Sequence, residues 1–275
     1  MSRLHCQRLG GRTHSQVCDR RPLKRPCPSG VYRRMGTYVL VHGASHDGSA
    51  FDEVVDRLQR LGHNAYAPTV AGHGKNAERD VGLAAATASV VEQIVAHELD
   101  DFVLLGHSWG GVVIAKVAEA LPERIRRLIF FSAMVLRDGE CAMDVWPPQN
   151  RGLITDLAAA STDNSVMLPF PFFRDAFMND ADLATARSVY DKLSPEPYRL
   201  LSENVDLSRF ETLDIPRSWL MGTEDIVMPP GEWGWHPRMS SRLGLYRLVQ
   251  MPGGHELMYT NPAGLAAKIV EAGRD

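Results

Sequence analysis

The chain has 275 residues, of which 44% are hydrophobic and 23% charged, a composition that suits a soluble globular protein with one large core. No apolar run approaches the roughly 18 residues of a membrane-spanning helix, so we expect no membrane partner. Residues 1–34 carry nine Lys/Arg against one acid, which leaves 21 Lys/Arg against 32 Asp/Glu in residues 35–275. An acidic body argues against nucleic acid as the main partner.

The basic leader over residues 1–34 is treated apart from the fold. It holds three of the four cysteines, and the body keeps a single thiol, Cys141, so the chain has no disulfide framework. The leader lacks the apolar stretch of a secretory signal and shows no clear amphipathic period of a transit peptide. We interpret it as a disordered extension, or as the product of a start codon upstream of a natural Met35. The body, 35–275, is expected to be one cytoplasmic domain, monomeric or homodimeric.

From residue 36 short apolar runs alternate with segments of helical periodicity. The runs predict strands, and the Phe/Val/Leu spacing of the segments between them predicts helices. In chain order these are strand 38–41, helix 51–61, strand 64–70, helix 83–99, strand 102–105, helix 109–121 and strand 128–131. This alternation predicts an α/β fold with a mostly parallel sheet and helices on both faces.

The alternation breaks between about Val135 and Pro216. This stretch has helical pieces and a Pro/Phe cluster but no convincing buried strand, so it predicts an insertion over the sheet rather than a separate domain. The alternation resumes with a strand at 219–221, a helix begun by two prolines near Gly231, a strand at 248–249 and a last helix from about Pro262.

A nucleophile motif stands where a predicted strand meets a predicted helix. Gly106-His107-Ser108-Trp109-Gly110 matches the G-x-S-x-G elbow in the context that this motif requires. The turn is strained and crowded, so a Cβ at Gly106 or Gly110 would clash. Ser108 also lies at a helix N-terminus, where backbone donors favour a developing negative charge. These features predict that Ser108 is a catalytic nucleophile rather than part of a chance Gly-Ser-Gly turn.

A nucleophilic serine needs a base, and the base needs an acid that orients it. In this architecture the order along the chain is Ser, acid, His, and only His236 and His255 follow Ser108. His255 lies in a Gly-rich loop after a strand, where sheet folds place their chemistry, whereas His236 is expected to be a surface or packing residue. Asp225 is preferred as the acid.

Two other carboxylates are alternatives to Asp225. Glu224, its neighbour, is the alternative within the same turn, and Asp138, after an earlier strand, is the runner-up.

The tetrahedral intermediate also needs two backbone donors. We expect the amides of Trp109 and Ala44, the latter in the loop after the first strand, to supply them. Ser45 and His46 of the same loop are candidates for the pocket lining, and His42 is expected to be structural.

These motifs, in this order, resemble the α/β-hydrolase superfamily. They are the run from Tyr38 to Ala44, the Gly-His-Ser-x-Gly-Gly elbow, Gly222-Thr223-Glu224-Asp225, and Gly253-Gly254-His255. Leu193-Ser194-Pro195-Glu196-Pro197 further resembles the compact branch of plant methylesterases, hydroxynitrile lyases and bacterial EstC-like or pyrethroid-type esterases. The resemblance covers about residues 36–273. It implies an α/β-hydrolase fold, a helical cap from about 135 to 212, and no cofactor.

Two departures from that branch bear on function. Hydroxynitrile lyases of the branch have Lys directly after the catalytic His, and here the residue is Glu256, which argues against cyanide chemistry. We expect Glu256 to turn to solvent. Trp109 is bulkier than the usual residue after the nucleophile and is expected to narrow the acyl site.

The leading hypothesis is therefore a serine hydrolase that acts on a carboxylic ester or lactone. The rivals are a cofactor-free carbon–carbon lyase or oxygenase on the same scaffold and a non-catalytic small-molecule receptor. A P-loop at 72–75 and a metal site both lack the required residues. Aromatic residues of the cap suggest an apolar substrate, with the predicted substrate-binding residues Ser45, His46, Trp146, Phe172 and Phe173.

Overall fold

The computed structural model describes residues 35–275, and the basic extension predicted at 1–34 lies outside the described residues. Six strands of the described part form one sheet in the order β2-β1-β3-β4-β7-β8, with every neighbouring pair parallel. They are β1 (Thr37–Val41), β2 (Asn64–Tyr66), β3 (Phe102–His107), β4 (Ile125–Phe131), β7 (Arg217–Gly222) and β8 (Arg247–Met251). The predicted α/β class with a parallel sheet is confirmed.

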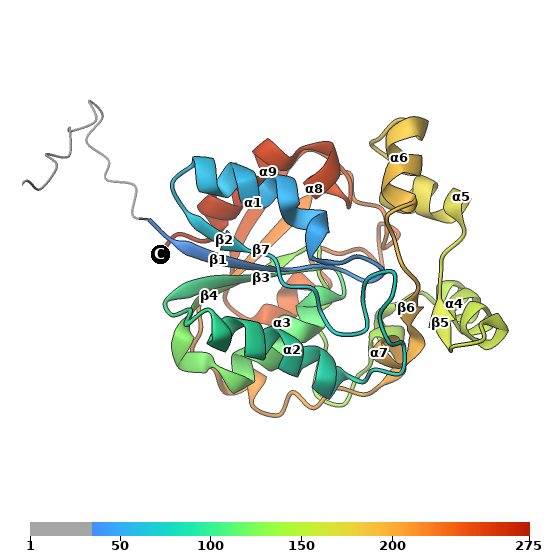
Figure 1. The fold of residues 1–275 in the computed structure, drawn as a ribbon, viewed down its shortest axis with the longest axis horizontal. Coiled ribbons are helices and arrows are strands. Elements are labelled where there is room, and N and C mark those ends of the chain that lie inside the picture. The colour runs from blue at the N-terminus through green and yellow to red at the C-terminus, as the bar shows by residue number, and fades with distance from the viewer. Residues whose placement is uncertain (1–34) are drawn as a thin grey trace, which may run out of the picture. The chain divides into compact units, whose positions relative to one another are not determined.

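Helices cover both faces of this sheet (Figure 1). One layer holds α1 (Asp52–Arg60), α8 (Leu257–Thr260) and α9 (Pro262–Ala272), and the other holds α2 (Leu83–Ala96) and α3 (Gly110–Ala120). Alternate strand residues enter two separate apolar clusters. Tyr38 and Leu40 pack with α1 and α9, whereas Val39 and Val41 pack with α2 and α3. Burial of both faces is why the strands read as continuous apolar runs.

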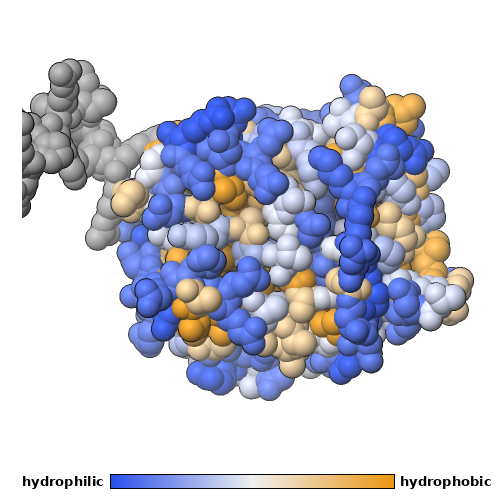
Figure 2. All heavy atoms as spheres, in the orientation of Figure 1, coloured by the Kyte–Doolittle hydropathy of each residue, from blue (hydrophilic) through white to orange (hydrophobic). Residues whose placement is uncertain are grey.

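Residues 132–216, between β4 and β7, are called the cap segment here. Its elements lie at one end of the sheet, at the right of Figure 1, and the surface there carries several apolar patches in Figure 2. The helices and strands of the cap segment are α4 (Pro148–Ala160), β5 (Ser165–Val166), α5 (Phe170–Phe172), α6 (Leu183–Tyr190), β6 (Glu196–Pro197) and α7 (Tyr198–Ser202). The expectation of no buried strand was wrong. β5 and β6 form a buried antiparallel pair, but two residues are too few to give a sequence period.

Two other element predictions need correction. The strand predicted over 64–70 ends at Tyr66, at the edge of the sheet. Pro68 follows two residues later and has no backbone N–H to donate to a neighbouring strand. The helix predicted near Gly231 is absent. Gly231 has a φ of 96°, and the chain runs through turns until a short 3₁₀ turn at Ser240–Leu243.

Candidate active site

Ser108 follows β3 at a sharp turn into α3. Its φ of 51° is left-handed, a conformation that costs energy for a residue with a Cβ and is found at functional turns. Ser108 N donates to Phe131 O at 3.1 Å, which ties the turn to β4. A Cβ built on Gly106 would meet Gly110 O at 2.5 Å, and one on Gly110 would meet His42 O at 2.5 Å. Both glycines are therefore required, as the sequence predicted.

His255 and Asp225 form a buried pair at the ends of β8 and β7. His255 Nδ1 lies 2.7 Å from Asp225 Oδ2, and both side chains are completely excluded from solvent. The other carboxylate oxygen of Asp225 accepts hydrogen bonds from Trp235 Nε1 at 2.9 Å and from Val227 N at 3.1 Å. Three contacts thus fix the carboxylate against the imidazole.

The alternative acid, Asp138, is hydrogen-bonded within the cap segment and not to His255. Its Oδ1 accepts from Leu207 N at 2.7 Å, which joins two parts of the cap segment. The other downstream histidine, His236, is partly buried and has its Nδ1 2.7 Å from Ser240 Oγ. The structure therefore brings Asp225, rather than Asp138, to His255, and gives His236 a packing environment.

The environment of His255 holds the ring in place and favours its charged form. Burial alone would lower the pKa of His255, but the Asp225 carboxylate, and after it Glu256, raise the pKa above its usual value of 6.5. The Trp235 ring stacks on the imidazole, with centroids 5.6 Å apart and planes at 12°. The Nε2 nitrogen has no hydrogen-bond partner among the described residues. It is available for a proton from a nucleophile.

Hydrogen bonds to the cap segment hold the loop that carries His255 in place. Asp180 Oδ2 accepts from Gly254 N at 2.8 Å and from Thr260 Oγ1 at 3.0 Å, on the two sides of His255 in sequence. The neighbouring Asn179 donates its Nδ2 to Glu224 O, beside the acid, at 3.0 Å. Sequence reasoning missed Trp235, Asp180 and Asn179, because each acts on the site from a loop that carries no motif.

The loop after β1 contains the first expected oxyanion donor. Neither Ala44 N nor Trp109 N donates a hydrogen bond to another described residue. His42 Nδ1 lies 2.9 Å from Gly43 O, and its Nε2 accepts from Val70 N at 3.0 Å. Burial, reinforced by nearby His73, lowers the pKa of His42 well below its usual value, so the ring is neutral and holds the loop. This is the structural position expected for His42.

The expectation that Glu256 turns to solvent was wrong. Glu256 is 1% exposed, and its Oε2 lies 3.3 Å from His46 Nε2. The Nδ1 of His46 lies 2.8 Å from Ala44 O, so this pair also holds the loop after β1 in place. Burial alone would raise the pKa of Glu256, but His46 lowers it to about 2. In turn, Glu256 raises the pKa of His46 against the effect of burial. The ion pair offsets the cost of burying both charges.

A cavity joins Ser108 and His255 to residues of the cap segment. The wall is predominantly apolar and includes four of the five predicted substrate-binding residues, Ser45, His46, Trp146 and Phe173. The fifth, Phe172, is not part of the wall. It packs beside Phe177, which lines the cavity instead, with centroids 6.3 Å apart.

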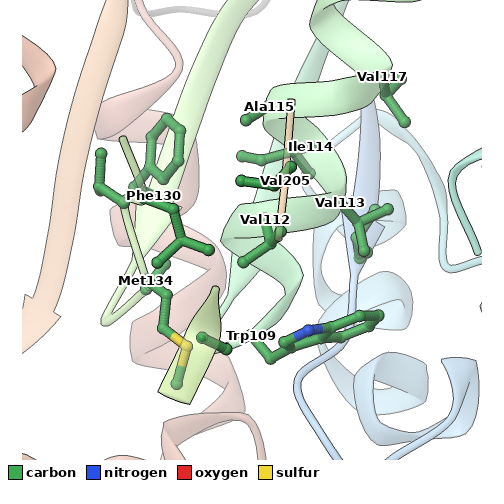
Figure 3. Close-up of a cluster of buried hydrophobic side chains, with 14 of the residues drawn as sticks. Trp109, Val112, Val113, Ile114, Ala115, Val117, Phe130, Met134 and Val205 are labelled. Carbon is green, nitrogen blue, oxygen red and sulfur yellow. The ribbon is translucent and has the colours of Figure 1, made fainter. Parts of the chain in front are cut away.

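The Trp109 side chain does not narrow this cavity, contrary to the prediction. It is fully buried at the start of α3, in the same apolar cluster as Val112, Val113 and Met134 (Figure 3). Its Nε1 donates to Leu200 O at 3.1 Å, in α7 of the cap segment. The large ring fits because it serves as packing between α3 and the cap segment, with only its backbone left near the nucleophile.

Over residues 35–275, no group of three or more His, Cys, Asp or Glu side chains has the arrangement to hold a metal ion. In the same range, no helix combines the length and the apolar character that crossing a bilayer demands.

Three features together define the class of α/β proteins with a nucleophile elbow. They are a parallel sheet, a serine with left-handed backbone at a strand–helix turn, and a buried His–Asp pair. Residues 38–268 match the model of the alpha/beta hydrolase family, and the chain belongs to this family.

Individual relatives narrow the comparison. The chain is 28% identical to the carbendazim hydrolyzing esterase of Nocardioides sp. (strain SG-4G), over 87% of this chain and 100% of that protein. It is 26% identical to a pyrethroid hydrolase of Sphingobium wenxiniae, over 85% of this chain and 86% of that protein. Among solved structures, an extracellular alpha/beta-hydrolase from a Paenibacillus species superposes with a TM-score of 0.86 at 42% identity, covering 87% of this chain and 100% of that one. That protein is described as sharing structural and functional homology with tobacco salicylic acid binding protein 2. The resemblance predicted from the motifs is confirmed, and the protein is an esterase-type α/β hydrolase.

Proposed function

We propose that the protein is a serine hydrolase that cleaves a carboxylic ester or lactone of a mainly apolar small molecule through an acyl-enzyme. The observation that carries this proposal is the buried His255–Asp225 pair, 2.7 Å apart, which shares one cavity with the left-handed Ser108. A receptor needs no such pair, so its presence favours catalysis. The relatives that hydrolyse carbendazim and pyrethroids support the same reaction class.

The proposed reaction begins with proton transfer from Ser108 Oγ to His255 Nε2, while Oγ attacks the substrate carbonyl carbon. Asp225 keeps the Nδ1 proton of the imidazole pointed at itself and stabilises the imidazolium that forms. The amides of Ala44 and Trp109, which have no other described acceptor, donate to the oxyanion.

Collapse of this intermediate releases the alcohol, which takes the proton from His255. Water then attacks the acyl-enzyme with His255 as base, and the carboxylic acid leaves. A lactone differs only in that the alcohol stays attached to the acyl chain.

Lyase chemistry of the same branch is disfavoured by charge. A departing cyanide needs a positive group beside the catalytic base, and Glu256 places a buried carboxylate there instead. We therefore expect hydrolysis of simple aryl esters and no cleavage of mandelonitrile above background. The test is one panel of aryl esters, lactones and mandelonitrile with the protein and with Ser108→Ala. Cyanide release without hydrolysis of any ester or lactone would reverse the assignment.

The domain organisation, oligomeric state and location of the protein are also proposals. We propose that residues 35–275 form one catalytic domain, in which the cap segment covers the active site, and that the protein acts as a monomer or homodimer. A cytoplasmic location stays a prediction and suits the free, buried thiol of Cys141. The Paenibacillus relative is described as extracellular, so cell fractionation is the direct test of location.

A further inference from the structure

A buried carboxylate interrupts the apolar wall that the cap segment gives to the cavity. Glu196, in β6, is 2% exposed and lines the same cavity as Ser108 and His255. A carboxylate is costly to bury unless it is hydrogen-bonded or paired, so each of its oxygens needs a partner.

One oxygen of Glu196 is fully engaged. Oε2 accepts from Ser45 N at 2.6 Å and lies 2.8 Å from His73 Nε2. Ser45 has a left-handed φ of 64°, and its carbonyl accepts from Ser194 N at 2.9 Å. These contacts hold the carboxylate beside the oxyanion loop, one residue beyond Ala44.

The other oxygen, Oε1, is buried and has no hydrogen-bond partner among the described residues. The second carboxylate of the cavity, Glu256, also has no hydrogen-bond partner for either oxygen among the described residues, but the Nε2 of His46 lies 3.3 Å from its Oε2 and balances its charge. Buried acceptors in folded proteins are nearly always satisfied, so an oxygen without a partner on a residue that lines a ligand cavity is a candidate acceptor for a donor group of the ligand.

We propose that Glu196 is a specificity-determining residue whose Oε1 accepts a hydrogen bond from an O–H or N–H group of the substrate. The proposal rests on the proposed function and names its substrate class as apolar esters or lactones with one hydrogen-bond donor. Because Oε2 is bound to the residue after Ala44, that donor lies near the scissile carbonyl. A site built to bind a donor rejects an analogue that lacks it, since its own polar atom then stays unpaired.

Glu196→Gln separates this role from mere positioning of the loop. Ser45 N can only donate, so the amide oxygen of Gln keeps the place of Oε2, and the amide NH₂ group takes the place of Oε1. The support of the oxyanion loop is retained while the open acceptor becomes a donor. Glu119→Gln is the matched control, because Glu119 is also buried and also accepts from a backbone amide, Arg209 N at 3.0 Å, but lies outside the cavity wall.

The experiment compares phenyl esters of 2-, 3- and 4-hydroxyphenylacetic acid with the corresponding methylphenylacetic esters, in which a methyl group replaces the hydroxyl. For at least one ring position we expect kcat/KM of the unsubstituted protein to favour the hydroxyl ester by about tenfold or more. Glu196→Gln should bring this ratio to about one or below, and Glu119→Gln should keep it. A ratio near one at every position, or a Glu196→Gln variant that slows both members equally, would overturn the proposal.

Binding without turnover keeps this test independent of the proposed function. The same ester pairs are titrated calorimetrically into Ser108→Ala and into Ser108→Ala/Glu196→Gln. A Kd preference for the hydroxyl member that disappears in the double variant supports the subsite even if no ester is hydrolysed. Equal Kd values for both members in Ser108→Ala contradict the subsite even if the esters are hydrolysed well.

Discussion

The sheet body and the cap segment contribute different things to the site. The body supplies the proposed reacting groups, Ser108, Asp225 and His255. Each follows the carboxyl end of a parallel strand, where such sheets gather their chemistry. The cap segment supplies much of the cavity wall, including Phe173, Phe177 and Glu196. The proposed chemistry thus depends on strand ends and strained turns, and the proposed substrate choice depends on side chains of short, irregular elements. Mutations in the two regions should accordingly change different kinetic constants.

The largest effect is expected for the base. His255→Ala should lower kcat on the order of 10³-fold or more, because the nucleophile then has no proton acceptor and the triad members act as a unit. Activity against aryl esters is the measurement. The unfolding midpoint in urea should be measured beside it to show that the fold persists. Near-normal turnover by a folded His255→Ala variant would contradict the proposed role.

A comparable loss is expected for the acid in the body but not for its rival in the cap segment. Asp225→Asn should lower kcat by roughly 10³-fold, because an amide in place of Oδ2 turns the imidazole to the wrong tautomer. Asp138→Asn should keep activity, since Asp138 serves Leu207 N rather than His255. Measuring both variants on one ester gives the comparison. The reverse pattern would move the acid to Asp138.

This contrast also explains what the sequence could reveal. Ser108, Asp225 and His255 stand in motifs with a characteristic spacing and strand context, so the sequence alone was enough to propose them as the catalytic residues. The buried position of Glu256 was missed because its partner, His46, lies 210 positions away in the chain. Phe172 and Phe177 are both aromatic, so nothing in the sequence distinguishes them. Which of the two lines the cavity depends on the path of the chain from α5 into the following π-helical turn. Trp235 lies in turns that carry no period.

The pH dependence of turnover should report the raised pKa of His255. The pKa of His255 is raised above 6.5 in the free protein, chiefly by Asp225, so the base becomes protonated at a higher pH than an ordinary histidine. The value of kcat/KM should therefore fall about tenfold per pH unit on acidification below that raised pKa. A profile of stable aryl esters from pH 5 to 9 checks this. A midpoint clearly below 6.5 would contradict the environment described for His255.

A stability effect is expected for the His46–Glu256 ion pair, which links the loop after β1 to the loop after β8. Glu256 has its pKa lowered to about 2, so its contribution is present above pH 4.5 and is lost as pH falls from there. His46 has its pKa raised, so its contribution is present below pH 6.5 and is lost as pH rises through the raised value. Glu256→Gln should therefore destabilise the fold most between about pH 4.5 and 6.5, by about 3 kcal/mol.

Urea unfolding of this variant and of the unsubstituted protein at pH 5.5 and pH 9 is the measurement. The stability difference should become smaller as pH rises through the raised pKa of His46. An equal difference at both pH values would show that the pair does not act through its charges.

The smallest effect is expected for a wall residue of the cap segment. Phe177→Ala removes a ring that packs edge-on against His255, with centroids 5.3 Å apart, and lines the cavity. It should raise KM for an apolar aryl ester by about tenfold and lower kcat much less, because lost apolar contact weakens ground-state and transition-state binding alike. Steady-state kinetics with a short and a long acyl chain give the split. A loss confined to kcat would place this residue with the chemistry of the body.

The most direct test of the central claim is covalent labelling of the nucleophile. An alkyl fluorophosphonate should add once per chain, and intact-mass and peptide analysis should locate the adduct on Ser108. Ser108→Ala should give no adduct, and His255→Ala should react far more slowly because the hydroxyl has lost its base. An adduct on another residue, or none on a protein that is hydrolysing esters, would contradict the assignment of Ser108.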